Sequence, residues 1–172
     1  MELPEPRWPR IFSTRFVCAV ATLGPVGRSL PAPGTWGSLA GLVYFALLFG
    51  HSRWEVSFAW TVVLCYVAVA FCGEAARRLG KSDPGEVILD EFVVMPLVFL
   101  GWRADHAAGW PEWLALLAGL ALFRFYDILK PLGIGRLQRW PGGWGIVADD
   151  CAAALAACGT LHLGAALWAW WR

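Results

Sequence analysis

Residues 54–73 read WEVSFAWTVVLCYVAVAFCG, an apolar stretch of 20 residues in which Glu55 is the single charged side chain. A helix needs about 20 mostly apolar residues to cross a bilayer, so this stretch predicts a membrane-spanning helix. Residues 110–130 and 145–171 have sufficient length as well, although the last range contains two aspartates near its start. The chain therefore has the pattern of a membrane protein.

Two shorter apolar ranges, 37–50 and 87–102, complete the set, and each predicts either a tilted span or a partly inserted helix. The expected fold is all-α: a polytopic membrane helix bundle with about five membrane helices in a single domain, residues 1–172. Composition agrees with this fold, because 58% of the residues are hydrophobic and 16% are charged. In soluble domains about 45–50% of the residues are apolar and about 25% are charged.

Other counts exclude some functions. The twelve tryptophans are typical of aromatic belts at membrane interfaces. A net charge of +1 gives no support for nucleic-acid binding. The five cysteines contain no C-x-x-C pair and lie mainly in apolar ranges, so we interpret them as small buried thiols instead of metal or redox groups.

The N-terminal region contains Ala19-Val20-Ala21, which resembles a signal-peptide cleavage site. The apolar stretch before it is interrupted by polar and basic residues at positions 13–15, which is wrong for a signal peptide. Phe12 and Phe16 fall at helical spacing on one face together with later apolar residues. Residues 11–24 are therefore predicted to form an interfacial amphipathic helix.

The distribution of basic residues predicts the orientation in the membrane. With the N-terminus in the cytosol, eleven lysines and arginines lie on the inner side or just inside it, and the outer side holds only Arg53, Arg103 and Arg172. The expected location is the cytoplasmic (inner) membrane, with several crossings. The same topology places every acidic cluster described below at the cytosolic face.

The last predicted helix is rich in alanine and glycine between positions 152 and 159. Small side chains let transmembrane helices approach closely, so this face is expected in the centre of the bundle. It would carry Asp149 and Asp150 inward. Exposed small-residue faces also permit a homodimer without requiring one.

Five acidic residues accompany the apolar ranges: Asp90, Glu91, Asp127, Asp149 and Asp150. A carboxylate near hydrocarbon is costly and usually marks a functional, water-filled site. The alternative is an internal ion-pair network, since Asp127 lies three residues from both Arg124 and Lys130. Three acidic clusters on one face favour the functional interpretation, a divalent-metal site.

Magnesium is the expected metal, because the clustered candidate ligands are hard carboxylate oxygens and not histidine or cysteine. His51, His106 and His162 fall on the outer half in the predicted topology. Residues 31–38, with Thr35 and Ser38, precede an apolar helix and form either an anion cradle or a helix cap and turn. The glycine-rich residues 141–145 have the same two interpretations.

Four ordered motifs resemble the phosphatidylglycerophosphatase A family. They are PGTWGS at 33–38, DP at 83–84 with DEF at 90–92, FRFYDILKP at 123–131, and GGWGI at 142–146 with DD at 149–150. The resemblance covers about Pro31 to Cys151. Two departures from the expected pattern are visible: Val94 replaces a glycine, and Leu132-Gly133 replaces Trp-Pro. Neither departure removes a charged group.

The resemblance implies a magnesium-dependent membrane phosphatase that converts phosphatidylglycerol phosphate, a phospholipid, to phosphatidylglycerol and phosphate. The acids and the resemblance together suggest that magnesium is held by Asp90, Glu91, Asp149 and Asp150. Asp127, Asp90 and Asp149 are the candidate catalytic groups, with Asp127 as a ligand, base or nucleophile. Arg124 and Lys130 are expected to bind the phosphoryl oxygens, with Lys81, Thr35 and Ser38 as weaker candidates.

Two functions of other classes remain open on the sequence alone. The same acids would suit a divalent-cation or proton-coupled transporter, although they gather at one end of the helices and no inverted repeat is visible. A structural membrane protein with ion-paired helices is the third interpretation. Direct attack by water and an aspartyl-phosphate intermediate, with Asp127 or Asp90 attacking phosphorus, also remain alternatives.

Overall fold

The computed structural model describes residues 4–102 and 110–171, and all regular elements within those ranges are helices. In chain order they are η1 (Trp8–Ile11), α1 (Thr14–Ala21), α2 (Val26–Ser29), α3 (Pro33–Leu48), α4 (Trp54–Leu79), α5 (Leu89–Val93), α6 (Met95–Val98), α7 (Glu112–Leu129), η3 (Pro131–Arg139) and α8 (Gly143–Trp171). The predicted all-α class is confirmed for the described residues. Arg103, His106 and Arg172 lie outside them.

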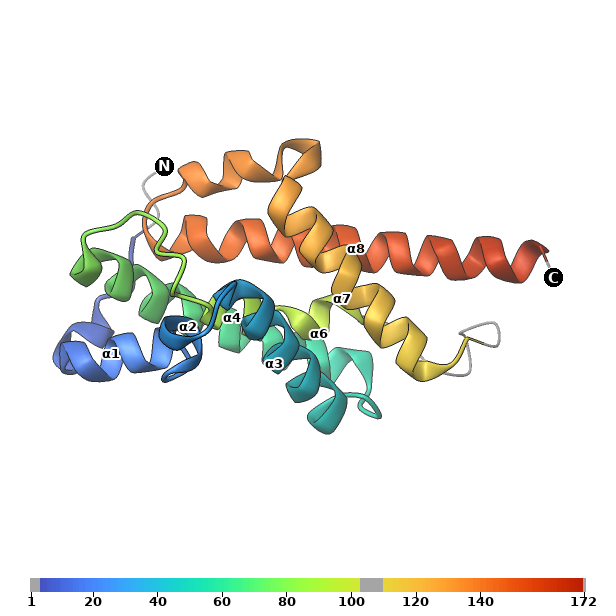
Figure 1. Cartoon of the computed structure of the whole chain (residues 1–172), viewed down its shortest axis with the longest axis horizontal. Coiled ribbons are helices and arrows are strands. Elements are labelled where there is room, and N and C mark those ends of the chain that lie inside the picture. Colours follow the sequence, from blue (N-terminus) through green and yellow to red (C-terminus); the bar gives the residue numbers. More distant parts are fainter. Residues whose placement is uncertain (1–3, 103–109, 172) are drawn as a thin grey trace.

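Two helices, α4 and α8, are long and apolar enough to cross a membrane, with 26 and 29 residues. The shorter α3 is apolar but has only 16 residues. The described residues therefore show two candidate spans, fewer than the five that we expected. Helix α8 lies along the long axis of the molecule, and α7 crosses it (Figure 1).

Helix α4 continues beyond the predicted range 54–73, because local ion pairs neutralise a buried acid in its last turns. The Glu74 side chain is 4% exposed, and Arg77 and Arg78 donate to its carboxylate at 2.5 and 2.6 Å. Charge pairs three and four residues apart lie on one helix face. The helix then ends at Gly80, whose φ of +67° is readily adopted only by glycine.

The N-terminal range 11–24 contains α1 and part of η1 instead of one continuous helix. Ser13 caps α1 by accepting a hydrogen bond from the Phe16 N–H at 3.3 Å. Arg78 of α4 donates to the carbonyl oxygens of Phe12 at 3.0 Å and of Pro9 at 3.4 Å. The segment is thus fastened to α4, while Ile11 and Phe16 remain exposed.

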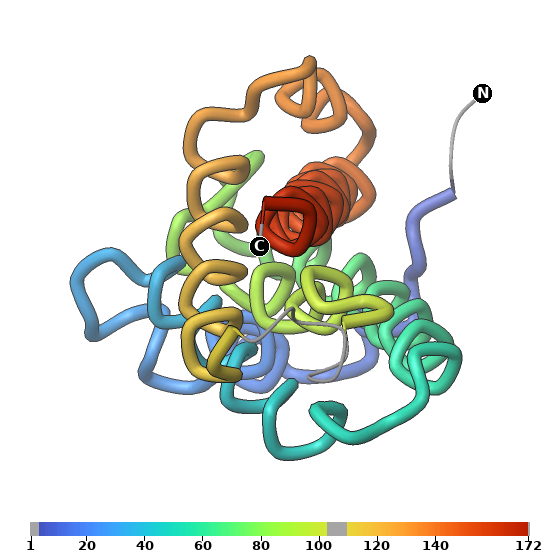
Figure 2. The backbone as a smooth tube through the Cα atoms, turned by 90° about the vertical axis from the view of Figure 1, so that its right-hand side faces the viewer, coloured from blue at the N-terminus to red at the C-terminus, as the bar shows by residue number. Residues whose placement is uncertain are grey.

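Residues 87–102 do not form one helix but two short ones, α5 and α6, separated at Val94. Pro96 has no backbone N–H to continue the helical ladder. The segment is also buried on all sides: Val94, Met95 and Val98 are 0% exposed. Hydrophobicity alone cannot distinguish such a fully buried broken segment from a lipid-facing helix. The buried chain passes between α3, α4 and α8 (Figure 2).

Helix α8 forms the centre of the packing, as the run of small residues predicted. Ala153, Ala154 and Ala157 are 0% exposed, and Asp149 and Asp150 are 3% and 4% exposed. A β-carbon on Gly143 would lie 1.9 Å from the Val69 carbonyl oxygen. Backbone contact between α4 and α8 therefore depends on glycine at this position.

The five cysteines are all free, with Cys18 and Cys72 buried and the other three partly buried. The Sγ atoms of Cys65 and Cys151 lie 3.7 Å apart between α4 and α8. At the far end of α8 from the aspartates, the ring of Trp110 packs against those of Trp102 and Trp168. The acids at the start of α8, which mark the acidic end of the molecule, and this tryptophan cluster thus lie at opposite ends of the helix.

Candidate active site

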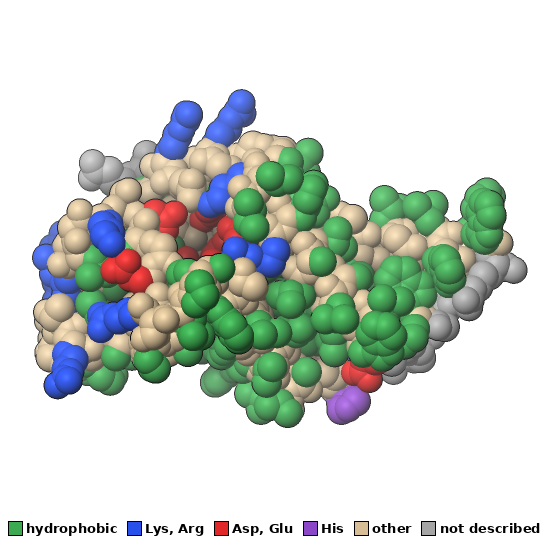
Figure 3. All heavy atoms as spheres, in the orientation of Figure 1, with side chains coloured by type: hydrophobic (Ala, Val, Ile, Leu, Met, Phe, Trp, Pro, Cys, Tyr) green, Lys and Arg blue, Asp and Glu red, His purple; other side chains and the backbone are tan. Residues whose placement is uncertain are grey.

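The three acidic clusters meet in space, each delivered by a different element. Asp90 and Glu91 are in the first turn of α5, Asp127 is near the end of α7, and the aspartate pair is near the start of α8. Asp150 lies within electrostatic range of Asp90, Glu91, Asp127 and Asp149. Figure 3 shows acidic atoms on the floor of a hollow with basic side chains around it.

Arg124 joins two of these clusters through one guanidinium nitrogen. Its Nη1 atom lies 2.7 Å from Oδ2 of Asp127, one turn away on α7, and 3.1 Å from Oε2 of Glu91 on α5. The arginine side chain is 20% exposed, and its Nε atom is buried without a partner. The guanidinium therefore keeps donor capacity that the two carboxylates do not use.

Ser38 brings the start of α3 into the same cluster. Its hydroxyl lies 3.0 Å from Oε2 of Glu91 and 2.8 Å from the Gly34 carbonyl oxygen, and it can donate to either. Arg124 Nη1 lies 3.4 Å from the Ser38 oxygen and donates to it. Ser38 is 0% exposed, so it orients Glu91 and Arg124 from inside the protein.

The glycines before Ser38 are needed for close approach. A β-carbon on Gly34 would lie 2.1 Å from Oε1 of Glu91, and one on Gly37 would lie 2.9 Å from the Ile88 Cβ. The segment 31–38 thus accommodates a carboxylate of the protein itself. Thr35 is exposed, and no side-chain contact joins it to the acids in the described structure.

The glycine-rich residues 141–145 serve packing. Gly143 approaches the backbone of α4, and a β-carbon on Gly145 would lie 2.5 Å from the Trp140 carbonyl oxygen. The geometry therefore supports a helix cap and turn for this segment instead of an anion cradle.

Lys130 contributes the second cation, and its Nζ atom pairs with Oδ2 of Asp149 on α8. It occupies the C-cap of α7 in the left-handed region, with φ +46° and ψ +45°. A non-glycine residue in this conformation is strained, and such strain gathers at functional sites. The turn directs the Lys130 side chain back toward the start of α8.

In the part of the chain that the structure describes, the acids outnumber the cations, since five carboxylates face only Arg124 and Lys130. Within the described residues, Asp90 and Asp150 form no ion pair, and both are at most 5% exposed. Buried oxygens Oδ1 of Asp90 and Oδ1 of Asp149 have no hydrogen-bond partner. Buried carboxylates without compensation are costly, so this arrangement calls for an additional positive charge.

The donor set fits a hard cation but not a closed protein cage. All candidate ligands are carboxylate oxygens, which suit magnesium. Among the described residues, however, no group of three or more acidic, histidine or cysteine side chains is arranged to hold a metal ion. Magnesium commonly binds through one or two carboxylates together with waters and substrate phosphate oxygens, and that mode of binding needs no group of three protein ligands.

Lys81 is not in contact with the five acids, because its Nζ atom pairs with Oε2 of Glu86 at 3.1 Å. The neighbouring Asp83, which we did not select as a site residue, lies closer. It accepts a hydrogen bond from Gln138 Nε2 at 3.1 Å and is within electrostatic range of Asp90 and Asp149. The sequence signal that could have identified Asp83 is its position in an Asp-Pro-Gly turn.

Comparison with known proteins places this sequence in a family. A family profile described as phosphatidylglycerophosphatase A matches residues 19–165. The phosphatidylglycerophosphatase A of Haemophilus influenzae is 37% identical over 126 residues, which cover 73% of this chain and 74% of the relative. The Escherichia coli protein of the same name is 31% identical over 137 residues, covering 79% and 76%.

A Bacteroides thetaiotaomicron relative is 34% identical over 134 residues, covering 75% of this chain and 80% of its own. Its name assigns it provisionally as a phosphatidylinositol-3-phosphatase. No solved structure matches the chain.

Proposed function

This chain belongs to the phosphatidylglycerophosphatase A family, and from that premise we propose that it hydrolyses the terminal phosphomonoester of phosphatidylglycerol phosphate. The products are phosphatidylglycerol and inorganic phosphate. The observation that carries the proposal is the pairing of Arg124 with Glu91 and Asp127, beside the pairing of Lys130 with Asp149. These two cations and three acids lie next to one another in the hollow of Figure 3.

Arg124 and Lys130 are proposed to bind the phosphoryl oxygens. Arginine presents a planar fork of donors and lysine a compact point charge. Both lie at the end of α7, and Glu91 with Ser38 fixes the guanidinium from the α3 and α5 side. A phosphate dianion that enters the hollow would meet both cations at once.

Asp90, Asp149 and Asp150 are proposed to hold magnesium, which would neutralise phosphate charge and lower the pKa of a bound water. Glu91 was part of the metal set that we expected from the sequence. Its Oε2 atom is engaged by Ser38 and Arg124, and its Oε1 atom lies against Gly34. We therefore propose that the main role of Glu91 is to position Arg124 and not to bind the metal.

Asp127 is proposed as the base or the nucleophile. It lies one helical turn from Arg124 and is held at 2.7 Å from that guanidinium. Direct water attack forms no covalent adduct with the protein, whereas the alternative passes through an aspartyl-phosphate. An acid quench during single turnover of substrate labelled in its terminal phosphate distinguishes the two, because only the second mechanism leaves label on the protein.

The multi-pass topology is part of the proposal. Helices α3, α4, α7 and α8 would cross, together with the broken segment containing α5 and α6. Irregular backbone at membrane depth is tolerated where protein surrounds it, and Val94, Met95 and Val98 are 0% exposed. The excess of basic residues would place the acidic end at the cytosol.

The transporter alternative gains no support from the structure. The acids collect near the start of α8 instead of lying along a path, and the remainder of that helix buries alanine and leucine. A homodimer stays a prediction, since a single chain does not test it.

The test is phosphate release by the purified protein from a panel of lipid phosphomonoesters, with magnesium or with a chelator. The panel contains phosphatidylglycerol phosphate, phosphatidic acid and phosphatidylinositol 3-phosphate. The proposal expects the highest kcat/KM for phosphatidylglycerol phosphate and loss of activity in the chelator. Preference for another head group would contradict the proposed substrate. Undiminished activity in the chelator would contradict the proposed requirement for magnesium.

A further inference from the structure

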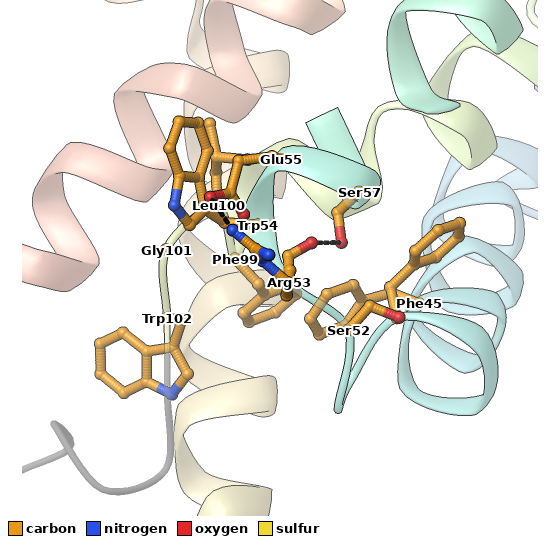
Figure 4. A pocket seen from close by; sticks show the side chains of 11 residues that line it. Phe45, Ser52, Arg53, Trp54, Glu55, Ser57, Phe99, Leu100, Gly101 and Trp102 are labelled. Carbon is orange, nitrogen blue, oxygen red and sulfur yellow. Dashed lines mark hydrogen bonds and ion pairs between the residues drawn. The ribbon is translucent and has the colours of Figure 1, made fainter. Parts of the chain in front are cut away.

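A cavity of about 270 Å³ lies at the start of α4 (Figure 4). Its walls come from the end of α3, the first turn of α4 and the segment after α6. The other end of α4 contacts the start of α8 through Gly73 and Gly143. At 1.5 Å per residue, roughly 30 Å of helix separates the two ends, so this cavity is distinct from the candidate active site.

The cavity combines one cation, one anion and several aromatic rings. Arg53 Nη2 lies 3.0 Å from Oε1 of Glu55, and the two side chains are 82% and 44% exposed. Trp54, Phe99 and Trp102 also line the space. Guanidinium groups bind phosphate, whereas carboxylates and aromatic faces attract ammonium groups. The lining therefore fits a ligand that carries both charges.

An apolar groove of about 540 Å³ continues from this cavity, and Phe49 and Glu55 line both. The groove follows one face of α4, where Val56, Trp60 and Val63 are at least half exposed. A polar cavity that opens into an apolar groove has the shape of an amphiphile. A soluble zwitterion would leave the groove unused.

We propose that this cavity and groove form a binding site for a zwitterionic phospholipid with an amine-bearing head group. Its phosphate contacts Arg53, its ammonium group contacts Glu55 and the rings, and an acyl chain lies in the groove. The site rests on the proposed membrane placement of α4. Anionic phospholipids, including phosphatidylglycerol, have no ammonium group to pair with Glu55 and therefore bind less tightly.

Native mass spectrometry of the full chain in detergent tests this proposal. The protein is titrated with phosphatidylethanolamine, with phosphatidylglycerol of the same chains, and with soluble phosphoethanolamine. Phosphatidylethanolamine is expected to bind most tightly. Glu55→Gln should lower its affinity about threefold or more, because an exposed charge pair contributes up to about a factor of five. The exposed acid Glu112 supplies the control, Glu112→Gln, which should bind like the wild type.

A second variant, Trp54→Leu, removes a ring without changing charge and should also weaken phosphatidylethanolamine binding. Equal affinity for the two lipids, or unchanged binding in both Glu55→Gln and Trp54→Leu, would overturn the proposal. Tight binding of phosphoethanolamine without lipid binding would overturn it as well. Phosphate release measured on the same samples separates the two proposals, since Glu55→Gln should retain wild-type release.

Discussion

A β-carbon on Gly34 would lie 2.1 Å from Oε1 of Glu91, so alanine at the start of α3 would force the Glu91 carboxylate in the first turn of α5 to move. Glu91 in turn contacts Ser38 and Arg124. Gly34→Ala should therefore displace Glu91 and, with it, the guanidinium. Since a displacement of about 1 Å can reduce catalysis 10²-fold, we expect kcat/KM to fall by about that factor.

The matched control is Gly159→Ala, because an added β-carbon there meets nothing within 4 Å. Activity of Gly159→Ala should equal that of the wild type. Near-normal phosphate release by Gly34→Ala would show that Glu91 does not position Arg124.

Arg124→Lys tests whether a fork of donors is required. Lysine keeps the charge but offers no planar pair of N–H groups, and it cannot reach Glu91 and Asp127 in the same geometry. We expect kcat/KM to fall about 10²-fold, measured as phosphate release. Arg136→Lys, at an exposed position of η3, should keep full activity. Equal rates for Arg124→Lys and the wild type would reduce the role of Arg124 to charge alone.

Gly143→Ala tests the packing of α4 against α8. A β-carbon at this position would lie 1.9 Å from the Val69 carbonyl oxygen. Overpacking of this kind costs about 1–3 kcal/mol, so thermal unfolding in detergent should occur at lower temperature. Gly164→Ala, where an added β-carbon meets nothing within 4 Å, should unfold like the wild type. Equal unfolding temperatures for the two variants would contradict the observed helix contact.

Arg78→Ala tests how the N-terminal segment is fastened. Arg78 donates to the carbonyl oxygens of Pro9, Arg10 and Phe12. Hydrogen bonds from a charged donor contribute about 1.5–3 kcal/mol, so the rate of tryptic cleavage after Arg10 should rise about tenfold or more. Arg139→Ala serves as the control. Unchanged cleavage at this position would mean that the segment is held instead by the packing of the Trp8, Phe12 and Phe16 rings against Phe71.

Sequence predicted the long elements because their signal is local. An uninterrupted apolar run suffices to place α4, and the alanines of α8 predicted its buried position. The division of residues 87–102 into α5 and α6 was not predicted, because Val94, Met95 and Val98 are buried by other elements. A run that is apolar on every side has no helical periodicity to read. The end of α4 also depended on how Glu74 pairs with Arg77 and Arg78.

The sequence predicted those site residues whose charged side chains are energetically costly to place near apolar segments. Acids beside apolar ranges are unusual, so Asp90, Asp127 and Asp149 could be selected without a structure. Their partners were less accessible, because the contact between Glu91 and Arg124 joins α5 to α7. The position of Gly34 against Glu91 joins segments that are still farther apart. Such contacts depend on tertiary packing, and the spacing of the residues along the sequence does not reveal them.

The most direct test of the account is phosphate release from phosphatidylglycerol phosphate by purified Asp149→Asn, compared with Glu112→Gln. Asp149 is 3% exposed, carries a buried oxygen without a partner and pairs with Lys130, whereas Glu112 is exposed at the start of α7. The account predicts a loss of about 10²-fold or more in kcat for Asp149→Asn and wild-type release for Glu112→Gln, with both variants folded. A folded Asp149→Asn protein with near-normal release would contradict the assignment of these carboxylates to catalysis.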